Sequence, residues 1–260
     1  MSHSRSFPRS EQREGVVLSG VRTAIGDYGG SLKDIAPSDL AARVVKKAVS
    51  RAKIDSKDVG QGIIGNVIHT EPRDMYISRL ACVNGGLPHD TGALTVNRLC
   101  GSGMQAIVSA SQYILLGETD AAAVVLMEKS AAAKKGLKPM ARIVAYGHAG
   151  IAPKIMGLGP VSAVQRALAK AGLQLDQMDV IEANEAFAAQ ALGVAKELGM
   201  NPAKLNPDGG AIALGHPLGA TGALLTVKAM YALHRTGGRY GLITMCIGGG
   251  QGIAAIIERA

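Results

Sequence analysis

The chain has little of what several classes of protein need. It has no tryptophan, two phenylalanines and six tyrosines, so few aromatic side chains could stack on nucleic-acid bases. No apolar run reaches the roughly 18 residues of a membrane-spanning helix. The three cysteines include no C-x-x-C pair and no secretory leader is visible, which argues against a disulfide framework and a zinc site. We therefore expect no nucleic-acid partner, no membrane, no bound metal and a reducing, cytoplasmic location.

The overall composition is that of an ordinary globular protein. The 260 residues are 47% hydrophobic and 18% charged, which suits one large domain or two modest ones. The formal net charge of +8 is compatible with a solvated basic face, and alternatively with a polyanionic small molecule as ligand. Composition alone does not separate these two interpretations.

Apolar periodicity predicts an alternation of strands and helices. Residues 1–13 lack that periodicity and are predicted to be a flexible tail. The predicted elements are a strand at 16–18, a helix capped by Ser38 or Asp39 and running to Arg51, a strand at 63–67, a helix at 78–83 and a strand at 93–96. Unbroken β-branched runs between helices indicate a largely parallel sheet covered on both faces.

The same order of elements then starts again. The stretch 37–66 is echoed by 160–184, and the stretch around Cys100 is echoed by 209–216, which is followed by a helix predicted from about Gly219 to Leu233. Two related halves, residues 14–127 and 128–260, would bring both helix starts together about a pseudo-twofold axis. The alternative is a chance similarity between two α/β units.

Cys100 lies in the run 97–103 (NRLCGSG), directly before a helical pattern of apolar residues. The first turn of a helix offers unpaired N–H groups and a positive dipole end, which stabilise a thiolate over a thiol. This placement favours a nucleophile. The alternative is a buried cysteine that behaves as a small hydrophobe.

Two further segments could supply partners for such a nucleophile. His216 stands between Gly215 and Pro217, in a tight turn that exposes an imidazole, although a lone histidine is ordinarily structural. Cys246 follows an apolar strand and precedes three glycines, residues 248–250. Glycine weakens a packed element, so these residues suit a turn whose amides hold an oxyanion, or alternatively a plain turn beside a buried cysteine.

Asn184 ends a predicted strand at 180–183, at the edge where ligands bind in open α/β folds. A polar side chain there suits a water or a substrate carbonyl. The alternative is that Asn184 caps the amphipathic helix predicted over Phe187–Leu198.

Four motifs taken together resemble the thiolase family, of the acetyl-CoA acetyltransferase or β-ketothiolase type. They are NRLCGSG at 97–103, NEAF at 184–187, GGAIALGHPLG at 209–219 and CIGGG at 246–250. The resemblance runs from about Glu14 to Ala260. It implies the thiolase fold, an α/β architecture of duplicated α-β-α-β-α layers made of two related halves.

The resemblance also implies roles for these residues. Cys100 would attack a thioester and carry the acyl group while His216 takes its proton, and Cys246 would move the α-proton of the second acyl-CoA. One oxyanion hole would consist of the backbone amides of Cys100 and Gly248, and the other of His216 with a water held by Asn184. Ala186 and Phe187 are implied contacts for coenzyme A. Acyl-CoA and coenzyme A would be the partners, within a homodimer or homotetramer active in fatty acid metabolism, with no separate cofactor.

The chain departs from the family pattern after Asp120. Thiolases normally continue there into a strand and a long covering region, whereas here Ala121–Met127 follows at once and resembles the last strand of the first half. Roughly a third of a usual thiolase, comparable to a small domain, is absent at this junction. Either one strand of the half-sheet is missing or Ala121–Met127 takes another position.

This departure keeps alternative functions open. One is a catalytically impaired thiolase-fold protein with a binding or structural role, because the floor and lid for coenzyme A are lost. Another is a decarboxylating condensing enzyme, which fits less well because Cys246 stands where that group relies on histidine.

Overall fold

The computed structural model describes residues 13–122 and 125–260, so the predicted tail lies outside the described residues except for Arg13. The strands are β1 Gly15–Val17, β2 Gln61–Gly65, β3 Gly92–Val96, β4 Ala121–Ala122, β5 Leu126–Glu128, β6 Ala141–Gly150, β7 Val180–Ala183, β8 Tyr240–Ile247 and β9 Gln251–Arg259. The helices are α1 Pro37–Ala52, α2 Ile77–Asn84, α3 Ser102–Leu115, α4 Lys129–Lys134, α5 Gly159–Ala171, α6 Ala188–Leu198, α7 Ala211–Leu214 and α8 Leu218–Thr236. Short 3₁₀ turns occur at Ser56–Asp58, Pro72–Tyr76, Pro153–Leu158, Leu175–Gln177 and Pro202–Lys204.

The strands form one nine-stranded sheet in the order β3-β2-β4-β5-β1-β6-β9-β8-β7. In the part of the chain that the structure describes, β2–β3, β2–β4 and β7–β8 are parallel and the other strand pairs are antiparallel. The expected largely parallel sheet is therefore wrong. The reason is that β8 and β9 are joined by a tight turn at residues 248–250, and a turn this short can only connect antiparallel strands.

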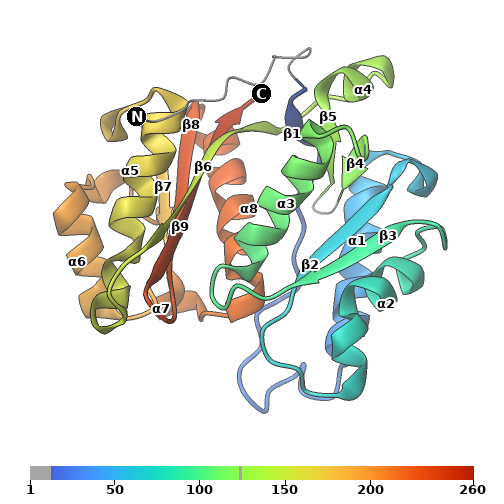
Figure 1. Ribbon diagram of the computed structural model, residues 1–260, viewed down its shortest axis with the longest axis horizontal. Helices are drawn as coiled ribbons and strands as arrows, with labels where there is room; N and C mark the ends of the chain where they lie inside the picture. Colours follow the sequence, from blue (N-terminus) through green and yellow to red (C-terminus); the bar gives the residue numbers. More distant parts are fainter. Residues whose placement is uncertain (1–12, 123–124) are drawn as a thin grey trace, which may run out of the picture.

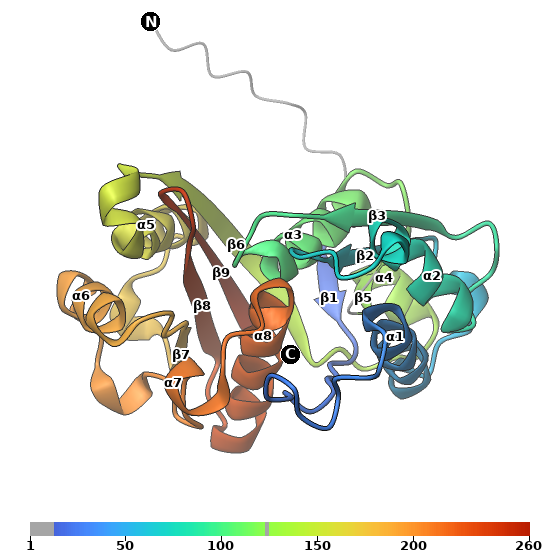
Figure 2. The same cartoon turned by 90° about the horizontal axis from the view of Figure 1, so that it is seen from below.

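The sheet and helices are arranged in five layers, which confirms the expected α-β-α-β-α architecture. Figure 2 shows α5 and α6 on one outer face and α1 and α2 on the other, with α3 and α8 between the two halves of the sheet. The central helices pack against each other, α3 also on β2 and α8 also on β7 and β8. Figure 1 shows the same central pair flanked by the two groups of strands.

The two halves of the sheet repeat one pairing scheme. Starting from the central antiparallel pair, β1 pairs with β5, β5 with β4 and β4 with β2, just as β6 pairs with β9, β9 with β8 and β8 with β7. In both series the first two pairs are antiparallel and the third is parallel. The predicted internal duplication thus describes the observed topology.

The first half is shorter at the predicted junction. Ala121–Met127, expected as a single strand, contains β4 and the start of β5, which run antiparallel with Ala122 opposite Leu126. Val125, at the turn into β5, has a φ of 37°, an uncommon conformation for a β-branched residue. Residues 121–122 and 126–127 therefore run in opposite directions instead of forming one strand.

Several local predictions are confirmed and others need correction. The helices expected at 78–83, after Cys100 and from Gly219 are present as α2, α3 and α8. Helix α1 begins at Pro37 with Ala36 as N-cap, so neither expected cap residue is used, because proline is preformed for the first helical position. The second predicted strand lies at Gln61–Gly65 instead of 63–67. No helix in the described ranges combines the length and apolarity needed to cross a membrane.

Candidate active site

Cys100 and His216 each precede one of the two central helices, and the first turns of these helices are in contact. Cys100 comes two residues before α3, and His216 two residues before α8. The backbones touch at glycines, since a Cβ added to Gly222 would lie 2.1 Å from the backbone N of Met104, and one added to Gly103 would lie 2.9 Å from the backbone N of Ala223. The predicted approach of the two helix starts is therefore confirmed.

Cys100 lies in a tight turn directly before its helix. Arg98 and Cys100 form an isolated β-bridge, and Leu99 between them has a φ of 45°. The Ser102 hydroxyl accepts a hydrogen bond from the Arg98 N–H at 2.8 Å and donates one to the Leu99 carbonyl at 2.7 Å. Cys100 is part-exposed, whereas Cys82 and Cys246 are both 1% exposed. It is the accessible thiol of the three, which disfavours its interpretation as a small core hydrophobe.

Cys246 lies within β8 near its end, not after the strand as expected. Burial raises the pKa of its thiol to about 11, with the nearby Cys100 as a second cause. Because Cys100 affects the pKa of Cys246 electrostatically, the two sulfur atoms lie close to each other. A Cβ added to Gly248 would lie 3.3 Å from Leu99 Cδ1, so the glycine turn approaches the turn that carries Cys100.

His216 is held as a neutral imidazole by its surroundings. Its Nδ1 lies 2.8 Å from Thr221 Oγ1, and that hydroxyl donates to the Pro217 carbonyl at 3.1 Å. Because the hydroxyl proton is used in that way, Nδ1–H is the donor to Thr221 and Nε2 is left as the proton acceptor. Burial lowers the pKa of His216 below its usual 6.5, so the ring can accept a proton at neutral pH.

Asn184 adjoins the imidazole and does not cap a helix. Helix α6 starts at Ala188 with Phe187 as its N-cap, so the capping alternative is wrong. Asn184 Nδ2 lies 3.4 Å from both ring nitrogens of His216. Its side chain is 2% exposed, and Oδ1 finds no hydrogen-bond partner among the described residues. A buried amide oxygen in this state suits a polar ligand or water.

Hydrogen bonds to the Glu185 carboxylate, which the sequence did not indicate, hold the segment before His216 in place. Glu185 accepts hydrogen bonds from Asn206 Nδ2 at 3.1 Å and from the Ile212 N–H at 3.0 Å. The same Asn206 side chain bonds both the N–H and the carbonyl of Ala183, at 2.9 Å each. Residues 209–216, expected to echo the stretch around Cys100, contain the short helix α7, and Glu185 accepts a hydrogen bond from its first turn.

The two residues implied as coenzyme A contacts lie beside this network. Ala186 is half-buried, and Phe187 is 62% exposed at the start of α6. An exposed aromatic ring is available for a ligand, but the structure brings neither residue into hydrogen-bonding contact with Cys100 or His216. Among the described residues no three His, Cys, Asp or Glu side chains are grouped closely enough to hold a metal ion.

Comparison with known proteins gives one consistent result. The family model for the thiolase N-terminal domain matches residues 15–152, and the model for the thiolase C-terminal domain matches residues 137–259. The chain is similar to the beta-ketothiolase BktB of Cupriavidus necator, with 42% identity over 95% of this chain and 99% of that protein. It is also similar to the acetyl-CoA acetyltransferase of Escherichia coli, with 32% identity over 94% and 98%.

Solved structures agree with these relatives. A crystal structure of Bacillus anthracis acetyl-CoA acetyltransferase superposes with a TM-score of 0.93 at 26% identity, covering 96% of this chain and 99% of that one. Human mitochondrial 3-ketoacyl-CoA thiolase in complex with CoA gives the same TM-score at 29% identity, covering 96% and 98%. The Cupriavidus alignment runs over 391 positions although this chain has 260 residues, so it leaves long gaps in this chain.

Proposed function

The chain belongs to the thiolase family and is an acyl-CoA C-acyltransferase, and we propose that Cys100 is the residue that carries the acyl group. The observation that carries the proposal is the grouping of one accessible thiol, one buried thiol, one neutral imidazole and one buried amide at the starts of the two central helices. Acyl transfer through a thioester needs this combination of a soft nucleophile and a separate base.

In the first half-reaction Cys100 attacks the carbonyl carbon of an acyl-CoA. Its proton passes to His216 Nε2, the Sγ–C bond forms, and the bond from carbon to the coenzyme A sulfur breaks. His216 then returns the proton to the leaving coenzyme A thiolate. The neutral ring and the Thr221 contact support this role, because they leave Nε2 ready to accept a proton.

In the second half-reaction Cys246 acts on the α-carbon of another acyl-CoA. Cys246 passes its thiol proton to His216, and its thiolate then removes the α-proton of the acyl-CoA. The resulting carbanion attacks the acyl carbon on Cys100, the Cys100 thioester breaks, and the released Cys100 thiolate takes the proton back from His216. Cys100 is one of the causes that raise the pKa of Cys246. Acylation turns the Cys100 sulfur into a thioester, which cannot become negative, so the influence of Cys100 on the pKa of Cys246 is removed and Cys246 loses its proton more readily. Thiolysis is the reverse sequence, with Cys246 as the acid.

Two groups of donors would stabilise the negative oxygens. The backbone amides of Cys100 and Gly248 would hold the oxygen of the acylated carbonyl. His216, once it carries a proton on Nε2, and a water bound by Asn184 would hold the enolate oxygen. Removing one such donor costs roughly 3–4 kcal/mol in measured enzymes.

The remaining expectations belong to the same proposal. Acyl-CoA and coenzyme A are the partners, with Ala186 and Phe187 as contacts, and no cofactor is needed. The protein acts as a homodimer or homotetramer in the cytoplasm, in fatty acid metabolism. Strand β3 supports an oligomer, because it is one of the two edge strands of the sheet and could pair with a second copy.

The test is thiolysis of acetoacetyl-CoA by the mass-verified chain of 260 residues. Wild-type protein should form acetyl-CoA, and Cys100→Ser should lose the activity while Cys82→Ser, at a buried thiol on α2, keeps it. Equal rates for wild type and Cys100→Ser would remove Cys100 from its role.

A second candidate function rests on the shortened strands β4 and β5. Loss of substrate-positioning contacts can remove about 7–11 kcal/mol of barrier lowering even when the reacting groups remain. The chain would then bind acyl-CoA, or serve a structural role, without turnover. Saturable binding of acetyl-CoA without thiolysis would favour this candidate, and ordinary turnover would exclude it.

A further inference from the structure

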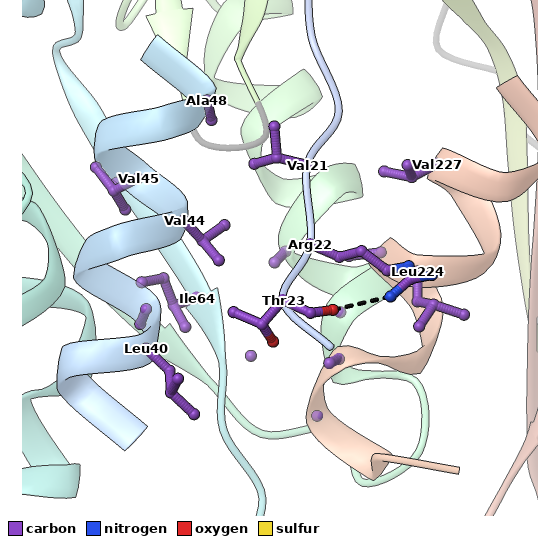
Figure 3. Close-up of a pocket in the computed structure, with 18 of the residues that line it drawn as sticks. Val21, Arg22, Thr23, Leu40, Val44, Val45, Ala48, Ile64, Leu224 and Val227 are labelled. Atoms are coloured by element: carbon purple, nitrogen blue, oxygen red, sulfur yellow. Dashed lines mark hydrogen bonds between the residues drawn. The ribbon is translucent and has the colours of Figure 1, made fainter. Parts of the chain in front are cut away.

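A cavity of about 440 Å³ lies in the first half of the molecule, at the place where the sheet is incomplete. Strand β2 forms one wall, the extended residues 19–26 another, α1 one side, and α3 with α8 the opposite side. Figure 3 shows Val44 of α1, Ile64 of β2, and Leu224 and Val227 of α8 around this space. An apolar cavity of order 150 Å³ already binds small ligands, so this one is too large to be a packing defect.

The second half of the chain shows what normally fills this position. There β7 pairs with the parallel strand β8 at four positions, Val180 to Ala183. In the first half β2 pairs with β4 at one position, Gln61 opposite Ala122. Strands β8 and β9 have eight and nine residues, whereas their counterparts β4 and β5 have two and three. Beyond Gln61, the described residues provide no strand beside β2 on that edge.

The cavity therefore has the surroundings of a strand position. It lies in the plane of the sheet, between an outer helix and the central helices, as a buried parallel strand would. Its walls are largely aliphatic, from Leu40 and Val44 on one side to Ala106 and Ala223 on the other. The edge of β2 adds backbone N–H and carbonyl groups, which an extended peptide can satisfy and an alkyl chain cannot.

We propose that this cavity is an acceptor site for one extended apolar peptide segment, which adds to the sheet as a strand parallel to β2. The segment comes from the residues that the longer relatives possess and this chain lacks, because their alignment extends over 391 positions against 260 residues here. The inference stands on the cavity and the sheet, and does not depend on the proposed acyl transfer.

The experiment titrates the full chain with overlapping synthetic peptides of about 12 residues, long enough for one strand. The peptides cover the part of the Cupriavidus necator protein that has no counterpart in this chain. Binding is measured by fluorescence anisotropy, and amide hydrogen exchange is followed at Ile63 and Gly65, whose N–H groups face away from β3. One peptide should bind and slow exchange at these amides by at least about tenfold, which corresponds to about 1.4 kcal/mol. A spin label at the amino end of the bound peptide should broaden the amide NMR signal of Gln61 more than that of Gly65.

Matched variants separate the cavity from the surface. Val44→Phe fills the space from α1 and Ala223→Leu fills it from α8, and each should weaken peptide binding at least about tenfold. Lys47→Phe places the same ring on the exposed face of α1 and should leave binding unchanged. The two filling variants lie on different helices, so misfolding of one does not remove the test.

Three results would overturn the proposal. One is that no peptide slows exchange in β2. Another is protection at Gly92–Val96 instead, which would place the peptide on the open outer edge of β3. The third is that decanoate binds, is excluded by Val44→Phe and is not displaced by any peptide, which would make the cavity a site for an alkyl chain.

Discussion

Gly222→Ala tests whether contact between the two central helices positions the reacting groups. The added Cβ would lie 2.1 Å from the backbone N of Met104 and 2.8 Å from its Cα, so no side-chain rotation can relieve the clash. The helices must separate, and core overpacking of this kind costs about 1–3 kcal/mol. Alanine returns about 0.5–1 kcal/mol of helix stability. We expect a net loss of about 1 kcal/mol and a fall in Tm of about 2–4 °C.

The same displacement should separate Cys100 from His216. A misplacement of about 1 Å can cost 10²-fold in rate, so acylation of Cys100 by acetyl-CoA should slow by about that factor. Gly193→Ala on α6 is the matched control, because its Cβ would meet only the end of the Leu158 side chain, at 3.3 Å. That variant should keep its rate, and its Tm should rise slightly, because alanine adds about 0.5–1 kcal/mol of helix stability at this position too. A Gly222→Ala protein with wild-type Tm and acylation rate would refute the reasoning.

Three other changes give separate checks. Cys246→Ala should slow deuterium exchange into the methyl group of acetyl-CoA by about 10²–10⁴-fold while Cys100 acylation continues, and equal loss of both would assign Cys246 a merely structural role. Acylation should fall at low pH with a midpoint below 6.5, because burial lowers the pKa of His216 and the protonated ring cannot act as base; a midpoint above 6.5 would contradict this. Burial raises the pKa of Glu182 to about 7 although Lys228 lies 2.8 Å away. Lys228→Met removes the cation that opposes this rise, so it should destabilise the fold by about 3–5 kcal/mol at pH 8 and by less at pH 6, where the carboxyl holds its proton; urea unfolding at both pH values measures this, and a pH-independent loss would contradict it.

The candidate site could be predicted because its residues carry local signals. Cys100 and His216 each stand in a glycine-framed turn before a helical pattern, and the internal repeat indicated that those two turns meet. Asn184 was ambiguous from sequence, since a strand-ending asparagine suits both a cap and a ligand contact. The start of α6 at Ala188 decided between them.

Other features depend on partners distant in the chain. Apolar runs such as β8 and β9 look the same in parallel and antiparallel sheets, so their direction could not be predicted. The division of Ala121–Met127 places a β-branched valine at positive φ, against its local preference, because tertiary packing overrides strand propensity there. The network of Glu185 and Asn206 joins residues 21 positions apart, and its one local signal was the turn-forming run Asn206–Gly210.

The central claim is that Cys100 carries the acyl group, and peptide mapping by mass spectrometry tests it most directly. The full chain is incubated with acetyl-CoA, quenched in acid and digested, and each cysteine peptide is examined. The account predicts one acetyl group on Cys100, none on Cys82 or Cys246, and loss of the label on addition of free coenzyme A. Acetylation at another residue, or none at Cys100 under conditions where acetyl-CoA is bound, would contradict it.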